Sequence, residues 1–313
     1  MSMLDLRRLS LLRDLADLGT VTAVAQRRNI TSSAVSQQLR VLEDETGAIL
    51  FRRDGRTLGL TRSGRVLLEH VRTVLEAVDD AMSALAATRD QVSGQIAVAS
   101  YNLGIPSFAA PLLQRLSGGT HDLQVQLRQA EPAEAVRLLR QGEVDLAITY
   151  RCDFEAQDML SGLSREVLLV EPLVLLAPTE FHSRIQSRGL AVLADQLWAT
   201  GTVDSILDVA LLRASEDAGF TPRITHRVET AQLVCDLAAT EVVPAVVPRL
   251  SVPSHMEYLI VDDIEVGDRT ISSLVRTGRQ RDPNIALILR TLRSIGEQTR
   301  VTTQRMPELV VAS

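Results

Sequence analysis

Residues 31–47 read TSSAVSQQLRVLEDETG, and their spacing predicts a short amphipathic helix. Val35, Leu39 and Leu42 recur at intervals of four and three residues, so they form one apolar side. At about 100° per residue, the opposite side carries polar groups, namely Ser33, Ser36, Gln37 and Arg40. Hydroxyl, amide and guanidinium groups can approach a surface closely and hydrogen-bond base edges or phosphates. The helix is therefore predicted to present this face to nucleic acid.

Two further helices are predicted ahead of this one. Leucines recur at helical spacing over residues 6–15, in a helix that ends near Gly19, and VTAVAQRRN (21–29) forms a second helix. Thr31 or Ser32 can cap the third helix. Two helices joined by a short turn, the second with a face that can read bases, describe a helix-turn-helix.

A basic hairpin is predicted directly after these helices. Residues 49–51 and 57–60 read as two short strands around an Asp54-Gly55 turn. The hairpin carries three arginines, which are Arg52, Arg53 and Arg56. Alone it could be a solvated turn, but beside a helix-turn-helix it is better interpreted as a wing that holds phosphate.

The segment AVAQRRNITSSAVSQQLRVLEDETGAILFRRDGRTLGLTRSG (23–64) resembles the N-terminal domain of LysR-type transcriptional regulators. It is similar in its AxA on the second helix, its LE on the third, and the later G-x-x-LF-x-R and LT-x-x-G. The resemblance implies a winged helix-turn-helix that binds double-stranded promoter DNA. The family often has Gln-Pro at the start of the recognition helix and Arg later, where this chain has Ser32-Ser33 and Gln37. The family's base preferences therefore do not carry over. The predicted DNA contacts are Thr31, Ser32, Ser33, Ser36, Gln37, Arg40, Arg52, Arg53 and Arg56.

A long helix is predicted over residues 63–89, which contain no proline. Its apolar residues are spaced as in the seam of a coiled coil, and they are Leu67, Val71, Val74, Val78, Ala81 and Leu85. The same stripe could pack against a neighbouring domain. Similar regulators dimerise through this helix, so the resemblance implies a homodimer or a homotetramer of two dimers. Two recognition helices would then meet half-sites about one helical turn, ~34 Å, apart.

The rest of the chain is predicted to be an α/β body with two lobes. Five segments from 95 to 150 alternate as strand, helix, strand, helix and strand, which implies a parallel sheet buried on both faces. EVLLVEPLVLLAP (166–178) contains two strand-like runs and crosses into a second lobe, and ISSLVRT (271–277) returns before a final helix from 284 to about 298. Two such lobes resemble periplasmic solute-binding proteins, and the regulatory half of the LysR-type family has that fold. The predicted domains are a winged helix-turn-helix (1–62), a linker helix (63–92) and an effector-binding domain (93–301), whose lobes are 93–165 with 268–301, and 166–267.

A small-molecule effector is expected between these lobes. In open α/β sheets, ligands bind beyond the carboxyl ends of the strands, which here are followed by Ser100, Tyr101, Asn102, Thr149, Tyr150, Arg151, Thr200, Gly201 and Thr202. Hydroxyls and N–H groups at helix starts suit a carboxylate or phosphate, and Arg151 could add a charge-assisted bond. Each residue could instead serve only in capping or a turn. The nine together favour a cleft for an effector that can be anionic.

Composition and motifs exclude several other classes. Residues 1–65 contain 11 arginines and 7 acids, whereas the rest contains 22 arginines and 32 acids, so a polyanion is expected to bind only the N-terminal segment. No catalytic or metal-binding motif is found, so we expect no enzyme and no cofactor. The start is not a signal peptide and no run reaches the ~18 apolar residues of a membrane span. A cytoplasmic protein is expected, with RNA polymerase as a candidate partner.

Two alternatives remain open at this level. Cys152 and Cys235 could make a redox-sensing regulator of the same fold, although Cys235 lies on an apolar helix. The chain could also be a solute receptor or an enzyme with an incidental DNA-binding head. The first alternative needs a reactive pair of thiols, and the second needs an export signal or a catalytic cluster.

Overall fold

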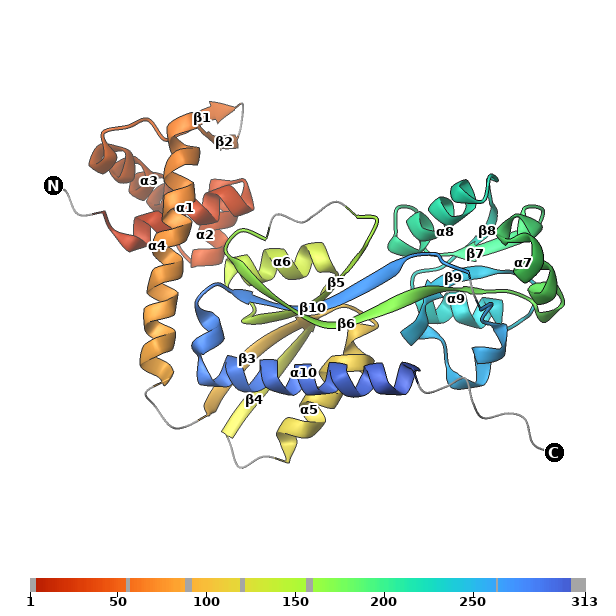
Figure 1. Cartoon of the computed structure of the whole chain (residues 1–313). Coiled ribbons are helices and arrows are strands. Elements are labelled where there is room, and N and C mark those ends of the chain that lie inside the picture. The colour runs from red at the N-terminus through yellow and green to blue at the C-terminus, as the bar shows by residue number, and fades with distance from the viewer. Residues whose placement is uncertain are drawn as a thin grey trace.

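The computed structural model describes residues 4–54, 57–87, 92–118, 122–155, 160–262 and 264–304. Figure 1 shows three parts in chain order: a small helical head, a long helix (α4), and a body with two lobes. The head begins with α1 (Leu6–Leu18), α2 (Val21–Arg28) and α3 (Ser32–Thr46), so the three predicted helices are confirmed.

The caps explain where the three helices begin. The side chains of Asp5, Thr20 and Thr31 each accept a backbone N–H from the first turn of the helix that follows. Thr31, and not Ser32, is thus the cap of α3. The predicted apolar side of α3 is buried in the core of the head, where Val35, Leu39 and Leu42 meet leucines of α1.

The wing is a two-stranded antiparallel hairpin of β1 (Phe51–Asp54) and β2 (Thr57–Leu60), in which Phe51 lies opposite Leu60. The prediction of a first strand at 49–51 was wrong. The Glu43 carboxylate accepts the backbone N–H groups of Leu50 and Phe51, at 2.8 and 3.0 Å, and holds the preceding segment against α3. The strand therefore begins at Phe51 and contains Arg52 and Arg53.

The long helix α4 (Arg62–Ala87) is confirmed, and its start is fixed by Thr61, whose hydroxyl accepts the Gly64 N–H at 3.0 Å. Its predicted apolar seam divides into two parts. Val71 is buried in the head core and Leu67 packs against that core. The other seam residues face solvent, namely Val74, Val78, Ala81 and Leu85. Part of the stripe thus packs against the chain's own head, as the alternative to a coiled coil suggested.

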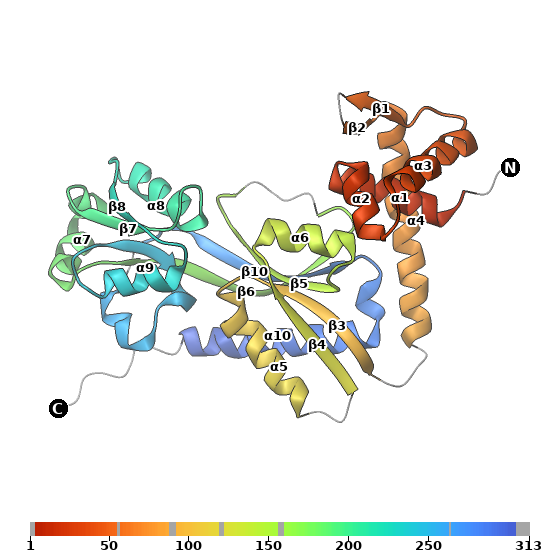
Figure 2. The ribbon, with the colours of Figure 1, turned by 180° about the vertical axis from the view of Figure 1, so that it is seen from behind.

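The first lobe confirms the predicted strand–helix alternation. β3 (Ser93–Ser100) is parallel to β4 (Asp122–Gln129) and to β5 (Leu146–Cys152). The connections contain α5 (Ala110–Ser117), which follows a turn of π-helix, and α6 (Pro132–Gln141). Figure 2 shows α5 and α6 on opposite faces of the sheet, so these faces are covered as expected. β4 is an edge strand of exposed and half-buried residues.

Two long strands join the lobes into one eight-stranded sheet of order β4-β3-β5-β10-β6-β9-β7-β8. β6 (Leu163–Leu176) and β10 (Asp268–Arg276) are antiparallel to each other, so the sheet is mixed. The two predicted runs at 166–178 are one strand, because β6 continues through Pro172. Its pairing with β10 ends at that residue, and pairing with β9 begins at Leu173.

The second lobe also alternates strands and helices after an initial helix. Its elements are α7 (His182–Arg188), β7 (Leu197–Thr200), α8 (Ile206–Asp217), β8 (Arg223–Arg227), α9 (Ala231–Ala238) and β9 (Ala245–Pro248). The chain returns through β10 to α10 (Pro283–Gln304), which packs against the first lobe. Among the described residues, no helix combines the length and apolar character needed to span a bilayer.

Candidate nucleic-acid interface and effector cleft

The outer face of α3 is the candidate base-reading surface. Thr31, Ser33, Gln37 and Arg40 are exposed, and Ser36 is half-buried. The hydroxyls are largely used within the helix: Thr31 Oγ1 lies 2.9 Å from Ser33 Oγ, and Ser36 donates to the Ser32 carbonyl at 2.9 Å. The long polar side chains that project from this face are therefore Gln37 and Arg40.

The inner contacts of α3 fix it against α1. Arg8 of α1 donates through Nε to Gln38 Oε1 at 3.0 Å and also binds the Glu45 carboxylate. Because Glu43 holds the start of the wing and Glu45 is paired with Arg8, two of the three acids at the end of α3 are bound within the head. The negative charge of these two groups is thus kept from the exposed face.

The wing arginines differ in how they are placed. Arg52 lies on β1 with an exposed side chain. Arg53 lies on the same strand, but its side chain is outside the described part of the structure, as is all of Arg56. Arg65 at the start of α4 is also exposed, and it donates to the Leu60 carbonyl of β2 at 3.0 Å.

A cavity of about 1200 Å3 lies between the two lobes. Its walls include the first residues of three helices, α6, α8 and α9, which come from both lobes. Figure 1 shows α6 and α8 on the same side of β6 and β10, one over each lobe. The polar side chains in the lining are Tyr101, Asn102, Gln129, Glu131, Arg140, Tyr150, Arg151, Glu155, Thr202, Asp204, Ser205, Glu229, Thr230, Gln232 and Arg269.

Five of the nine predicted effector residues line this cavity, namely Tyr101, Asn102, Tyr150, Arg151 and Thr202. The other four do not. Ser100, Thr200 and Gly201 are buried, and a side chain on Gly201 would collide with Ser205. Thr149 is buried, and with Thr270 and Ser272 it lines a smaller pocket that shares Tyr150 and Arg151 with the cavity.

The floor of the cavity is aromatic and contains a buried cation. The rings of Tyr101 and Tyr150 meet edge to face with centroids 4.6 Å apart. The Arg269 guanidinium lies 5.4 Å from the centroid of Tyr101 and 5.0 Å from that of Tyr150. Burial raises the pKa of both tyrosines, so they remain neutral hydrogen-bonding groups.

The charged groups of the cleft are mixed in sign, and several already bind protein atoms. Arg151 donates to the Glu155 carbonyl at 3.1 Å, and the Glu155 carboxylate accepts the Cys152 N–H at 2.6 Å. Tyr150 donates to Glu131 at 3.3 Å. The lining contains four acids and three arginines in all, which suits a ligand with both acceptor and donor groups better than a simple anion.

Arg269 and the acids of the second lobe were missed by sequence reasoning. Ser205 and Thr230, however, are N-caps whose hydroxyls accept the N–H groups of Asp208 and Leu233, both at 3.3 Å. A hydroxyl residue directly ahead of a helical pattern is the sequence signal that could have found this wall of the cleft. Arg269 gave none, because its partners come from distant parts of the chain.

The two cysteines do not form a reactive pair. Cys152 and Cys235 are free and buried, and they belong to different core clusters. Burial raises the pKa of Cys152 to about 12 and that of Cys235 to about 11. Thiols of this kind are poor nucleophiles at neutral pH. In the described part of the chain, three or more potential metal ligands do not gather at any point.

Comparison with known proteins agrees with both halves of this arrangement. The family model described as "Bacterial regulatory helix-turn-helix protein, lysR family" matches residues 6–65, and the one described as "LysR substrate binding domain" matches residues 89–296. The nitrogen assimilation regulatory protein nac of Klebsiella aerogenes is 27% identical over 174 residues, which is 55% of each chain. The transcriptional regulator AlsR of Bacillus subtilis is 23% identical, and the match covers 74% of that protein and 72% of this chain. The chain thus spans about half the length of the first of these relatives.

Two solved structures have a similar fold over most of the chain. ArgP from Mycobacterium tuberculosis superimposes with a TM-score of 0.62 at 22% identity, covering 94% of this chain and 98% of that one. LysG from Corynebacterium glutamicum, solved with bound effector Arg, gives a TM-score of 0.59 at 19% identity, with 94% and 99% covered. At these identities the similarity shows the fold.

Proposed function

The chain belongs to the LysR family of bacterial regulators, and from this premise we propose that it binds promoter DNA sequence-specifically under the control of a small molecule held between its lobes. The supporting observation is that the two sides of α3 differ in burial. Its apolar side is buried in the head core, while Gln37 and Arg40 project into solvent on the other. Such a helix can enter the major groove without disturbing the head.

In this proposal the DNA contacts divide by role. Gln37 and Arg40 read base edges, because amide and guanidinium groups can bind adenine and guanine bidentately. Thr31, Ser32, Ser33 and Ser36 lie close to the DNA backbone at the start of α3. Arg52, Arg53 and Arg56 of the wing bind phosphates, which adds affinity but no sequence preference.

The effector would act by changing the angle between the lobes. β6 and β10 connect the lobes, and the cavity walls come from both of them. A ligand shifts this equilibrium only if it binds one arrangement of the lobes more tightly than the other. The mixed lining favours a small polar molecule with a carboxylate and a hydrogen-bond donor, which would contact the helix N-termini and the acids respectively.

We further propose a dimer formed through the exposed part of α4, and a tetramer of two such dimers on DNA. Residues 1–62, 63–92 and 93–301 would be its DNA-binding, linker and effector-binding units. Because promoter DNA and RNA polymerase lie in the cytoplasm, that is the expected compartment, and the polymerase is a candidate partner.

Protection mapping on the DNA flanking the gene tests this function. The purified chain should protect discrete sites at low salt and in the presence of unrelated competitor DNA, and a metabolite screen should then find a compound that raises its melting temperature. If no site is protected at low salt, with or without cell extract, the receptor or enzyme alternative is favoured instead.

A further inference from the structure

The carboxylates of the effector cleft have no cationic partners in the protein. Four acids line the cavity, namely Glu131 and Glu155 of the first lobe and Asp204 and Glu229 of the second. Within the described part of the chain, none of these four belongs to an ion pair. Acids close to the cavity do form such pairs. Asp208 on α8 lies 2.8 Å from Arg227, and Glu143 after α6 lies 2.9 Å from Arg128.

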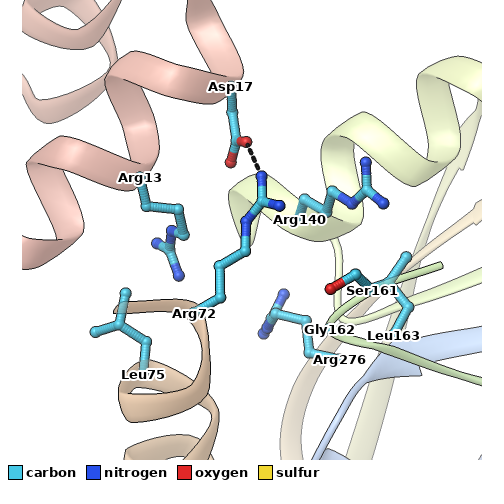
Figure 3. Close-up of a pocket in the computed structure, with 9 residues that line it drawn as sticks. All are labelled: Arg13, Asp17, Arg72, Leu75, Arg140, Ser161, Gly162, Leu163 and Arg276. Atoms are coloured by element: carbon cyan, nitrogen blue, oxygen red, sulfur yellow. Dashed lines mark hydrogen bonds and ion pairs between the residues drawn. The ribbon is translucent and has the colours of Figure 1, made fainter. Parts of the chain in front are cut away.

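The arginines of the lining do not balance these acids. Arg269 is neutralised by Glu171, which lies outside the lining. Arg140 is already engaged, and it also lines a small cavity between the head and the body, which Figure 3 shows. Arg151 donates to the Glu155 carbonyl at 3.1 Å and has no carboxylate partner among the described residues. The cleft is thus left with more negative than positive charge.

The floor of the cleft gives an independent indication of a ligand. Tyr101 is 2% exposed and lines the cavity, yet its hydroxyl has no hydrogen-bond partner among the described residues. The hydroxyl of the neighbouring Tyr150 is bound, because it donates to Glu131 at 3.3 Å. A buried polar group without a partner destabilises the protein. A ligand that reaches the floor can remove this cost, since a phenol hydroxyl accepts as well as donates a hydrogen bond.

The two lobes bring their acids to the cleft from opposite sides. Glu131 lies at the start of α6, whereas Asp204 and Glu229 lie in the loops just ahead of α8 and α9. Like charges that approach one another as the lobes close repel, and a cation between them removes the repulsion. We propose that the effector carries a protonated amine, which binds Glu131 and Tyr101 at the floor and the two acids of the second lobe.

This inference rests on the proposed function and specifies the ligand of its cleft. An ammonium group has three hydrogen-bond donors and no acceptor, so it can serve a carboxylate from each lobe and the Tyr101 oxygen at once. Because those partners come from both lobes, the amine binds more tightly when the lobes are closer together. It therefore shifts the equilibrium between the lobe arrangements, as a regulator of DNA binding must.

A matched series of probes tests the charge of the ligand. Cadaverine, δ-aminovalerate and glutarate have the same chain length, with two amines, one amine and one carboxylate, or two carboxylates at their ends. Thermal unfolding of the full chain is measured with each, without DNA and with ionic strength held constant by sodium chloride. We expect cadaverine and δ-aminovalerate to raise the melting temperature at millimolar concentration, and glutarate to leave it unchanged. A shift by glutarate that equals theirs, or no shift by either amine, overturns the proposal.

Calorimetry of variants then locates the amine. Glu131→Gln and Glu229→Gln should each weaken δ-aminovalerate binding by about tenfold, because a charge-assisted hydrogen bond is lost. Glu216→Gln is the matched control, since it removes an exposed acid of α8 outside the lining, and it should change the affinity by less than about twofold. Tyr101→Phe should weaken binding by about fivefold without lowering the melting temperature of the free protein, because its hydroxyl has no partner to lose. Tyr150→Phe should lower that temperature, because its bond to Glu131 is lost.

The variants also separate this inference from the function on which it rests. Equal losses of affinity in Glu216→Gln and Glu229→Gln would overturn the site, because they would show a general effect of charge. Promoter protection is measured without the probes. A chain that protects discrete DNA sites but binds glutarate in preference to the amines would keep the proposed function and lose this class of ligand.

Discussion

Arg269 and Glu171 form a buried ion pair beneath the effector cleft, although 98 positions separate them in the chain. Their side chains are 3% and 1% exposed, and Arg269 Nε donates to Glu171 Oε1 at 2.9 Å. The second carboxylate oxygen accepts the Leu250 N–H at 2.7 Å. The pair thus connects β10, β6 and the segment after β9, and it holds Arg269 under the two tyrosines of the cleft floor.

Glu171→Gln should lower the free energy of unfolding by about 3–5 kcal/mol, because it leaves the Arg269 charge buried without its partner. Urea denaturation measures this loss. Glu166→Gln, on the same strand, removes a carboxylate that pairs with the largely exposed Arg293, so it should cost much less stability than Glu171→Gln. Equal losses in the two variants would contradict the role of burial.

Gly64→Ala should destabilise the head. A Cβ at Gly64 would lie 2.2 Å from the Leu50 carbonyl oxygen, so either α4 or the start of the wing must move. Overpacking of this kind typically costs about 1–3 kcal/mol, and DNA affinity should fall with it. Gly118→Ala is the matched control, because a Cβ there meets no atom within 4 Å. Thermal unfolding and gel shift of both variants give the comparison.

Gln37→Ala and Arg52→Gln should affect DNA binding in different ways. The first should change the preferred bases in a selection from random DNA, because Gln37 projects from the exposed face of α3. The second should weaken binding to all sequences and reduce the salt slope by about 1, because one phosphate contact is lost. If Gln37→Ala left every base preference unchanged, the base-reading face would have to be reassigned.

The buried thiols should make the protein less stable at high pH. Burial raises the pKa of Cys152 from 9.0 to about 12, so between these values the folded state keeps a proton that the unfolded state has lost. Stability is therefore unaffected by this group below pH 9.0 and falls as the pH rises above it. Urea unfolding across this range should show the fall, and Cys152→Ala should reduce its slope.

The burial of the two cysteines predicts thiol behaviour that a redox switch would not show. Both cysteines should react slowly with a thiol reagent in the native protein at neutral pH, and quickly once urea is added. Peroxide should leave migration on non-reducing gels and DNA binding unchanged. Rapid labelling of Cys152 in the native state would instead support the redox alternative.

The sequence predicted those features that depend on near neighbours. The helical spacing of Val35, Leu39 and Leu42 was sufficient to place α3 and its polar face. The strand–helix alternation was sufficient to place the first lobe. It also brought Tyr101 and Tyr150 to the cleft, but it did not indicate that Thr149 is buried and lines only the smaller adjoining pocket.

Features that depend on distant partners could not be predicted. The two strand-like runs expected at 166–178 are one strand, β6, which exchanges β10 for β9 as its partner at Pro172. Arg269 reaches the cleft floor because β10 returns beside β5 and β6, which no local pattern indicates.

The divided seam of α4 gives a last prediction. Val71 is 2% exposed because it packs in the head core, whereas Val74 and Val78 are 41% and 37% exposed one and two turns later. If two copies pair through this exposed part, Val78→Glu should shift the protein toward monomer in sedimentation experiments, because a buried glutamate at a helix seam is costly. Thr73→Glu, at an exposed position away from the seam, should leave the assembly intact.

Because two linked heads bind two half-sites more tightly than one head binds either, Val78→Glu should also weaken binding to the full operator while single half-site binding persists. An unchanged sedimentation profile would place the dimer contact elsewhere, and α4 would then serve only to join the head to the body.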